Sequence, residues 1–297
     1  MTIEFEGKKL TPETVPIGEG PPTREQLLVH YPASFTWHQL KTFVNSGDLG
    51  LLKRDKRLQR RYMAWSKVVT AEYGSVANYL LNYRLQWGRP DTRSILKSRL
   101  DLPADPRSFP ALPSSRTQPK QSLVPTVPPG APSYFTADIS PELISIISND
   151  WPYSIPAHIE HTLIWTVVDI IPPNVPESIK PRLYQDGLWG FTGYSNDSPP
   201  PSPSKLSNCL PALAEWGVTE DKMIRSAKGT PEEEQAVIEA GGEIQTFIVR
   251  RWNEREWETA WFVNPPRLQS IPSLAHIHVF ARCKDQTEQE GWNLEHA

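Results

Sequence analysis

The chain has 297 residues and a formal net charge of −3, so its overall charge does not attract it to nucleic acid or to a membrane. Its two cysteines, Cys209 and Cys283, exclude a disulfide framework and a CxxC zinc site. No apolar run approaches the roughly 18 residues of a membrane span, and the start MTIEFEGKKL lacks the apolar core of a signal peptide. We expect a cytoplasmic protein without a membrane partner.

The N-terminal part is predicted to be an extended arm followed by three helices. Residues 1–33 contain PIGEGPP and lack helical periodicity. The first helix is TWHQLKTFVNSG, which opens with the capping residue Thr36. RDKRLQRRYMAWSKVVTAEYG follows, capped by Asp55 and ended by Gly74, and SVANYLLNYRLQWG is the third. We assign residues 1–102 to this part.

The middle of the chain alternates between proline-rich segments and short elements. Residues 103–137 are dense in proline and predict a linker or a strap that lies across the surface. SPELISIISND predicts a short helix, and AHIEHTLIWTVVDI predicts a strand that stops at PPNVP. The serine-proline insert SNDSPPPSPSK is expected to be mobile.

The C-terminal half predicts a sheet. Residues 219–240 predict two short helices, and the second has a capping box at TPEEE. GGEIQTFIVRRW and WETAWFV predict a β-hairpin, and SLAHIHVFARC supplies another strand. We therefore expect an α+β fold, in which an N-terminal helical part packs on a C-terminal, mainly antiparallel sheet with short helices over residues 138–283. Residues 284–297 form a polar, frayed tail, and all parts make one functional unit.

Two pairs of histidines fall on predicted strands. In IPAHIEHTLIW, His158 and Glu160 share one strand face, while His161 lies on the other face unless a bulge brings it round. In SLAHIHVFAR, His276 and His278 share a face. Imidazoles transfer protons near neutral pH, and a neighbouring carboxylate sets their tautomer, so we predict a catalytic pocket. The alternative is that these histidines bond only water and backbone at a sheet edge.

Other residues near these strands are candidates for substrate binding. They are His158, Trp165, Asp169, Trp261, Asn264 and Arg282. The two tryptophans can wall a pocket, and the acids suit a cationic substrate. Asn264 lies in a rigid NPP turn, where a purely structural role is the alternative. Two histidines on one strand face can also bind zinc or iron with a third ligand, but nothing fixes that ligand's distance. No metal and no cofactor are therefore expected.

A run of positive charges precedes the second helix and continues into it. It comprises Lys53, Arg54, Lys56, Arg57, Arg60 and Arg61. On a helix, Arg57, Arg60 and Arg61 lie on one face. In a chain of net negative charge this concentration predicts a patch for a phosphate backbone, with a solvated helix face as the alternative. The common nucleotide-binding and hydrolase motifs GxGxxG, GKS/GKT, GxSxG and HExxH are absent.

Several segments together resemble a fungal family. They are ASFTWHQLKTFVNSGDLGLLKRDKRLQRRYMAWSK, EYGSVANYLL, EHTLIW and WFVNPPRLQSIPSLAHIHVFAR. The family is named for the N-acetylglucosamine-induced protein of yeasts and is a domain of unknown function. The resemblance covers roughly residues 30–90 and 155–283 and leaves out both proline-rich segments.

This family is associated with fungal cyclodipeptide synthases that make arginine-containing cyclic dipeptides in secondary metabolism. The resemblance implies charged tRNA as the partner, namely arginyl-tRNA and a second aminoacyl-tRNA, and no DNA. The basic run would then hold tRNA phosphates, and Glu160 or another acid would hold the arginyl guanidinium. His276, His278 or His161 would take the proton from the attacking amine.

Two other functions are compatible with the same residues. HIHVFAR resembles the H-φ-H-φ-H-φ-φ motif of histidine-triad nucleotide hydrolases and transferases, in which His278 would attack phosphorus. It departs from that motif at Phe280, where the family has a third histidine. The remaining alternative is a regulatory protein that binds a small ligand without turnover.

Overall fold

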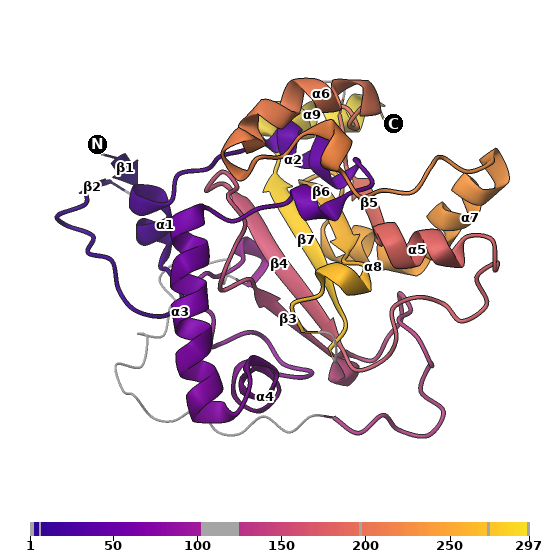
Figure 1. Cartoon of the computed structure of the whole chain (residues 1–297), viewed down its shortest axis with the longest axis horizontal. Helices are drawn as coiled ribbons and strands as arrows, with labels where there is room; N and C mark the ends of the chain where they lie inside the picture. Colours follow the sequence, from indigo (N-terminus) through magenta and orange to yellow (C-terminus); the bar gives the residue numbers. More distant parts are fainter. Residues whose placement is uncertain (1–2, 6, 102–124, 196–197, 272–273, 296–297) are drawn as a thin grey trace.

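A five-stranded antiparallel sheet forms the centre of the molecule (Figure 1). The computed structural model describes residues 3–5, 7–101, 125–195, 198–271 and 274–295. The strands are β3 (Ile144–Ser148), β4 (Ile159–Thr166), β5 (Leu188–Thr192), β6 (Trp257–Val263) and β7 (His276–Cys283). Their order across the sheet is β3-β4-β7-β6-β5, so the two histidine-bearing strands β4 and β7 are hydrogen-bonded neighbours. The predicted α+β class is confirmed.

Helices surround this sheet on both faces and at its edges. They are α1 (Arg24–His30), α2 (Trp37–Val44), α3 (Lys56–Tyr73), α4 (Val76–Tyr79), α5 (Lys180–Asp186), α6 (Leu206–Cys209), α7 (Pro231–Ala240), α8 (Gly242–Arg251) and α9 (Gln286–Glu295). A small hairpin of β1 (Ile3–Phe5) and β2 (Lys8–Leu10) precedes them, and α4 continues as a π-helical turn over Leu80–Arg84. Every helix in the described ranges is too short or too polar to span a membrane.

The N-terminal helices begin and end where their capping residues predict. The Thr36 side chain accepts the N–H of Gln39 in a full capping box at the start of α2. Asp55 accepts two backbone N–H groups at the start of α3, and Gly74, with a φ of 81°, ends that helix. The predicted helices from Thr36 and Asp55 are confirmed, and α3 lies beside the β3–β4 edge of the sheet in Figure 1.

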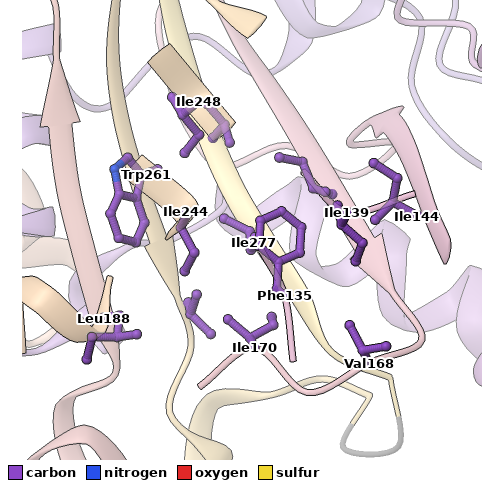
Figure 2. Packing of buried hydrophobic residues seen from close by; sticks show 14 of the residues in the cluster. Phe135, Ile139, Ile144, Val168, Ile170, Leu188, Ile244, Ile248, Trp261 and Ile277 are labelled. Carbon is purple, nitrogen blue, oxygen red and sulfur yellow. The ribbon is translucent and has the colours of Figure 1, made fainter. Parts of the chain in front are cut away.

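One face of the sheet is covered by α8 and by the segment that contains Phe135 (Figure 2). Ile277, Val279 and Ala281 point to this face from β7 and are fully buried, as their alternation in HIHVFAR predicts. The opposite face carries the histidines and is covered by α2 and by residues around α4. Since both faces are buried, polar side chains between the layers must find partners inside the protein.

Two predicted elements were wrong in type. SPELISIISND was predicted to be helical, but after a single turn it forms β3, which pairs antiparallel with β4. Its closely spaced isoleucines favour a strand once a partner strand is present. GGEIQTFIVRRW was predicted to be a strand, but it forms α8, in which Ile244 and Ile248 lie one turn apart against the sheet. The partners of β6 are therefore β5, which was not predicted, and β7.

The prediction of a frayed tail was also wrong. Within this tail, Gln286–Glu295 form α9, and Glu288 of this helix pairs with Arg282 of β7 at 2.6 Å. The serine-proline insert is held where Ser198 donates to Glu258 at 2.8 Å. Most of the predicted proline-rich strap, residues 103–124, lies outside the described residues. Its end is anchored, because Phe135 is fully buried in the core.

Shortening Ile244 to valine tests the corrected assignment of α8. Ile244 is 1% exposed and packs against the sheet, so Ile244→Val is expected to lower the free energy of unfolding by about 1 kcal/mol. Urea denaturation measures this change. The matched control Ile238→Val lies on α7, where Ile238 is 67% exposed, and should leave stability unchanged. Equal effects of both substitutions would contradict the packing described.

Candidate active site

Three buried histidines meet on one face of the sheet. The antiparallel register of β4 and β7 places His161 diagonal to His278, and His161 Nε2 lies 3.0 Å from His278 Nδ1. The ring centroids of His276 and His278 are 4.9 Å apart. Trp165 stacks on His276 at 4.2 Å and Phe262 stacks on His278 at 4.4 Å. The fold thus brings together imidazoles that are over a hundred residues apart in the chain.

The hydrogen bonds define which ring nitrogen of His276 is free. Its Nδ1 lies 3.2 Å from the Leu274 carbonyl oxygen, which can only accept, so Nδ1 carries the proton. The Nε2 atom of the neutral ring then presents a lone pair, and no described residue bonds to it. By contrast, His161 and His278 are each bonded at both ring nitrogens, with Asn264 3.3 Å from His278 Nε2. His276 is therefore the best placed of the three to accept a proton.

All three imidazoles are neutral near pH 7. Burial lowers the pKa of His276 to about 4. Burial also lowers the pKa of His161 and His278 well below the usual value, and the positive charge of Arg54 adds to this effect. The site therefore offers hydrogen-bond acceptors and proton acceptors, and it does not offer imidazolium acids.

His276 and His278 line a small cavity of about 70 Å³, which we call the histidine cavity. A volume of this size has room for only a few non-hydrogen atoms, such as the reacting ends of a larger ligand. Asp150 lies in its wall. Each Asp150 oxygen accepts one bond from Arg84, which leaves a second lone pair on each oxygen. Trp151 lies in the wall as well.

Two tryptophans of the wall carry buried donors without a partner. The indole N–H groups of Trp151 and Trp165 have no acceptor in the described part of the chain. The same is true of Trp37, Trp87 and Trp252, which do not line the histidine cavity, so these donors do not mark it as a ligand site.

A groove of about 620 Å³ adjoins the histidine cavity, and we call it the basic groove. Four of the six predicted phosphate-binding residues line it, namely Lys53, Arg54, Lys56 and Arg60. Arg54, Tyr153 and Asn264 line both the groove and the histidine cavity. The side chains of Lys53 and Arg60 make no hydrogen bond or ion pair with another described residue, so their charges are available to a ligand.

Arg54 connects these two spaces rather than extending a helix face. It precedes α3, its guanidinium lies over the rings of Tyr62 and Tyr153 at 4.8 and 5.5 Å, and its Nε donates to the Trp151 carbonyl at 2.8 Å. These contacts hold a fixed positive charge at the junction of the groove and the histidine cavity.

The two remaining basic residues do not line the groove. Arg61 bonds the Gly20 carbonyl at 2.7 Å and Gln26 at 3.0 Å, so it anchors the N-terminal arm. Arg57 pairs with Asp55 at 3.2 Å and its side chain is 54% exposed. Arg57, Arg60 and Arg61 were predicted to act together on one helix face. In the structure Arg60 lines the groove, Arg61 holds the N-terminal arm and Arg57 is exposed beside Asp55.

A second, larger cavity of about 330 Å³ lies beside the histidines, and we call it the apolar cavity. Glu160 and His161 both line it at the start of β4, although they point to opposite faces of the strand. Glu160 accepts hydrogen bonds from the Ser98 hydroxyl at 2.7 Å and the Arg99 backbone N–H at 2.6 Å. Burial raises the pKa of Glu160. Glu160 does not line the histidine cavity.

Three predicted substrate-binding residues lie away from both cavities. His158 is exposed in the turn before β4, and Asp169 is exposed beyond the end of β4. Trp261 points to the opposite face of the sheet, where its indole donates to Gln245 at 2.6 Å. Trp165 and Asn264, in contrast, line the histidine cavity.

Arg282 faces the histidine side of the sheet but belongs to a buried ion cluster. It pairs with Glu258 at 2.7 Å and with Glu288 at 2.6 Å, and Glu258 also pairs with Lys41 at 2.6 Å. Glu258 and Lys41 are fully buried and bonded to Ser198. Because its donors are used here, Arg282 has a structural role.

Sequence reasoning missed the segment NDWPYS between β3 and β4. It supplies Asn149 and Tyr153, which line both cavities, and Asp150. The only local sign was a proline flanked by aromatic and polar residues directly before a histidine strand. Within the described ranges, no group of three or more His, Cys, Asp or Glu side chains is arranged to hold a metal ion.

Comparison with known proteins places the chain in a family. No curated protein matches it. A solved structure titled "Crystal Structure of HTC1" matches with 16% identity and a TM-score of 0.36 over 88% of this chain and 94% of that chain, a likeness too low to carry an argument. A family model matches residues 36–184 and 223–282, and so includes the first proline-rich segment and omits the second. The chain therefore belongs to the family described as "Protein of unknown function (DUF3605)".

Proposed function

We propose that the protein is an aminoacyl-tRNA-dependent cyclodipeptide synthase that makes an arginine-containing cyclic dipeptide. One observation carries the proposal: the basic groove adjoins the histidine cavity, and Arg54, Tyr153 and Asn264 line both. A tRNA 3′ end is a polyanion that carries a small reactive ester. The groove suits its phosphates and the cavity suits the ester.

The reaction needs proton acceptors and no external energy source. The α-amine of one aminoacyl group attacks the ester carbonyl of the other, a C–N bond forms, the C–O bond breaks and the first tRNA leaves with its hydroxyl restored. The free amine of the resulting dipeptide then attacks the second ester, which closes the ring and releases the second tRNA. His276 Nε2, free and neutral, takes the amine proton in each step and passes it to the departing tRNA oxygen, which returns the imidazole to its neutral form.

The histidine cavity, at about 70 Å³, would have to widen to take the arginyl guanidinium beside the ester, and Asp150 is then the acid placed to hold it. Asp150 lines the same cavity as His276, among the aromatic rings of Tyr62, Trp65 and Trp151. A guanidinium packs well on aromatic faces and pairs with a carboxylate that has free lone pairs. Glu160, the acid expected from the sequence, lines the apolar cavity instead of the histidine cavity, and its oxygens each accept one bond, from Ser98 and from Arg99.

The histidine-triad alternative is less well supported by the geometry. Its nucleophile would be His278, yet both ring nitrogens of His278 are bonded, to His161 and Asn264. The histidine with the free ring nitrogen is His276, which stacks on Trp165 and is not the position that the histidine-triad motif assigns to the nucleophile.

Mass spectrometry of extracts from cells that express the protein tests the proposal. The expected result is a diketopiperazine that contains arginine and is absent from cells carrying the empty vector. Folded protein at high level with no arginyl diketopiperazine would refute the function.

Reversing two charges in the basic groove is expected to weaken tRNA binding. Lys53→Glu combined with Arg60→Glu should lower affinity and reduce the slope of log affinity against log salt by about 0.7 for each phosphate that the variant no longer neutralises. The control, Lys228→Glu with Arg255→Glu, makes the same charge change at exposed residues outside the groove and cavities. Filter binding over a salt series measures both variants, and equal weakening would show that only net charge matters.

A further inference from the structure

The apolar cavity has a shape and lining that suit an uncharged organic group. Its volume is about 330 Å³, several times that of the histidine cavity. The apolar part of its wall includes Leu27, Leu28, Tyr31, Leu58, Ile155 and Ile159. Cavities of this size with mainly apolar walls and a few polar groups are typical small-ligand sites.

The apolar cavity meets the histidine cavity at the histidine pair. His161 lines the apolar cavity and bonds His278, which lines the histidine cavity, at 3.0 Å. Asn149 and Tyr153 line both cavities. A single layer of side chains therefore lies between the two spaces, and ligands in each would have their inner ends close together.

Two unpaired cations at the apolar cavity can meet the anionic end of a ligand. Arg24 and Lys97 line it, and neither side chain makes an ion pair or hydrogen bond within the described part of the chain. Asp55 lines it too, but its carboxylate pairs with Arg57 and caps α3.

Glu160 also lies in the wall of the apolar cavity, where each of its oxygens accepts one bond, from Ser98 and from Arg99, and burial raises its pKa and so disfavours its charged form. The predominantly apolar wall is therefore what favours an uncharged side chain.

We propose that the apolar cavity is the subsite of the second aminoacyl-tRNA, for an aliphatic or aromatic side chain. Arg24 and Lys97 meet the phosphates of its 3′ end, and its ester lies beside His161. The assignment rests on the proposed function, because a reaction that joins two aminoacyl groups must hold both at once in contact.

Puromycin binding tests this subsite without requiring turnover. Puromycin carries an O-methyltyrosyl group on an adenosine analogue through a stable amide, so it imitates an aromatic aminoacyl-tRNA end. Ala33→Trp and Ala157→Trp place a large ring at exposed alanines of the cavity wall. Each is expected to weaken puromycin binding at least about tenfold, since the ring fills space needed for an apolar side chain. Puromycin aminonucleoside, which lacks the amino acid, should bind wild type at least about tenfold more weakly than puromycin.

The matched control is Ala227→Trp, an exposed alanine in a different hollow beside Arg182, which should bind puromycin like wild type. Circular dichroism verifies each fold, and the second plug variant gives the answer if the first does not fold. No binding to wild type, or full binding to the plug variants, overturns the subsite.

The two proposals fail separately. Puromycin binding that the plugs abolish, with no diketopiperazine in extracts, refutes the synthase and supports the subsite. Arginyl diketopiperazine production with unchanged puromycin binding in the plug variants supports the synthase and refutes the subsite.

Discussion

Replacing His276 with phenylalanine is expected to lower the rate of cyclic dipeptide formation by about 10²-fold, the lower end of the usual contribution of a general base, because a pKa of about 4 makes it a weak base. The substitution keeps the stacked contact with Trp165 and removes the free Nε2 atom. Affinity for tRNA should stay unchanged, since the residues of the basic groove are untouched. Single-turnover formation of product, with tRNA bound at saturation, measures the effect.

His158→Phe is the matched control for this experiment. Like His276, His158 lies in one of the two histidine-containing strand segments of the sequence. It is exposed, however, and lines none of the described cavities. It should react at the wild-type rate. A rate for His276→Phe within a few fold of wild type would remove His276 from the chemistry.

Acidification is expected to destabilise the protein steeply. In the unfolded chain each histidine binds a proton below about pH 6.5, whereas burial keeps His161, His276 and His278 neutral in the fold. The unfolded state therefore gains protons first, and stability falls as the pH drops below 6.5. Each histidine contributes about 1.4 kcal/mol per pH unit, and the three together about 4 kcal/mol per unit. For His276 the loss ends near pH 4.

Urea denaturation at pH 7 and pH 5 measures this loss of stability. The variant His276→Phe shows how much of the loss comes from His276. Between these pH values the variant should lose about 2 kcal/mol less than wild type, because one titrating group is gone. Buried Glu160, whose pKa is raised, acts in the opposite direction in both proteins and cancels in the comparison. Equal losses in the two proteins would show that His276 is not held neutral in the fold.

The histidine strands were predictable because their pattern is local. In HIHVFAR, apolar β-branched residues alternate with histidines, so a strand with one polar face was the natural interpretation. The antiparallel neighbours β4 and β7 bring His161 and His278 together through a regular register, without the bulge considered for His161 from the sequence. His158 and Glu160, which were predicted to share the other face of the strand, do not line the histidine cavity. The helices from Thr36 and Asp55 were equally well marked by their caps.

The two elements predicted wrongly, β3 and α8, have sequences that fit either a helix or a strand, and their packing partners decide which forms. ISIIS is a short apolar run that fits either a helix or a strand, and its pairing with β4 decides for β3. IQTFIVRR contains strand-forming residues, yet the spacing of Ile244 and Ile248 lets one helical face cover the sheet. In both cases tertiary packing overrides local preference.

The parts of the site that escaped prediction come from irregular segments and from partners distant in sequence. Asn149 and Tyr153 have no periodic pattern to mark them. Arg60 and Arg61 are adjacent and chemically identical, yet the N-terminal arm occupies Arg61 and leaves the Arg60 side chain unpaired among the described residues. Composition identifies a basic run, but only the docking of the arm determines which charges are free.

The most direct measurement is the transfer of radiolabelled arginine from arginyl-tRNA by the purified protein, given a pool of other aminoacyl-tRNAs and no ATP. If the groove presents charged tRNA ends to the neutral imidazoles, label should pass into an extractable diketopiperazine, and the Lys53→Glu and Arg60→Glu double variant should need far more tRNA for the same rate. Label that stays on tRNA, or appears only as free arginine, would contradict that account.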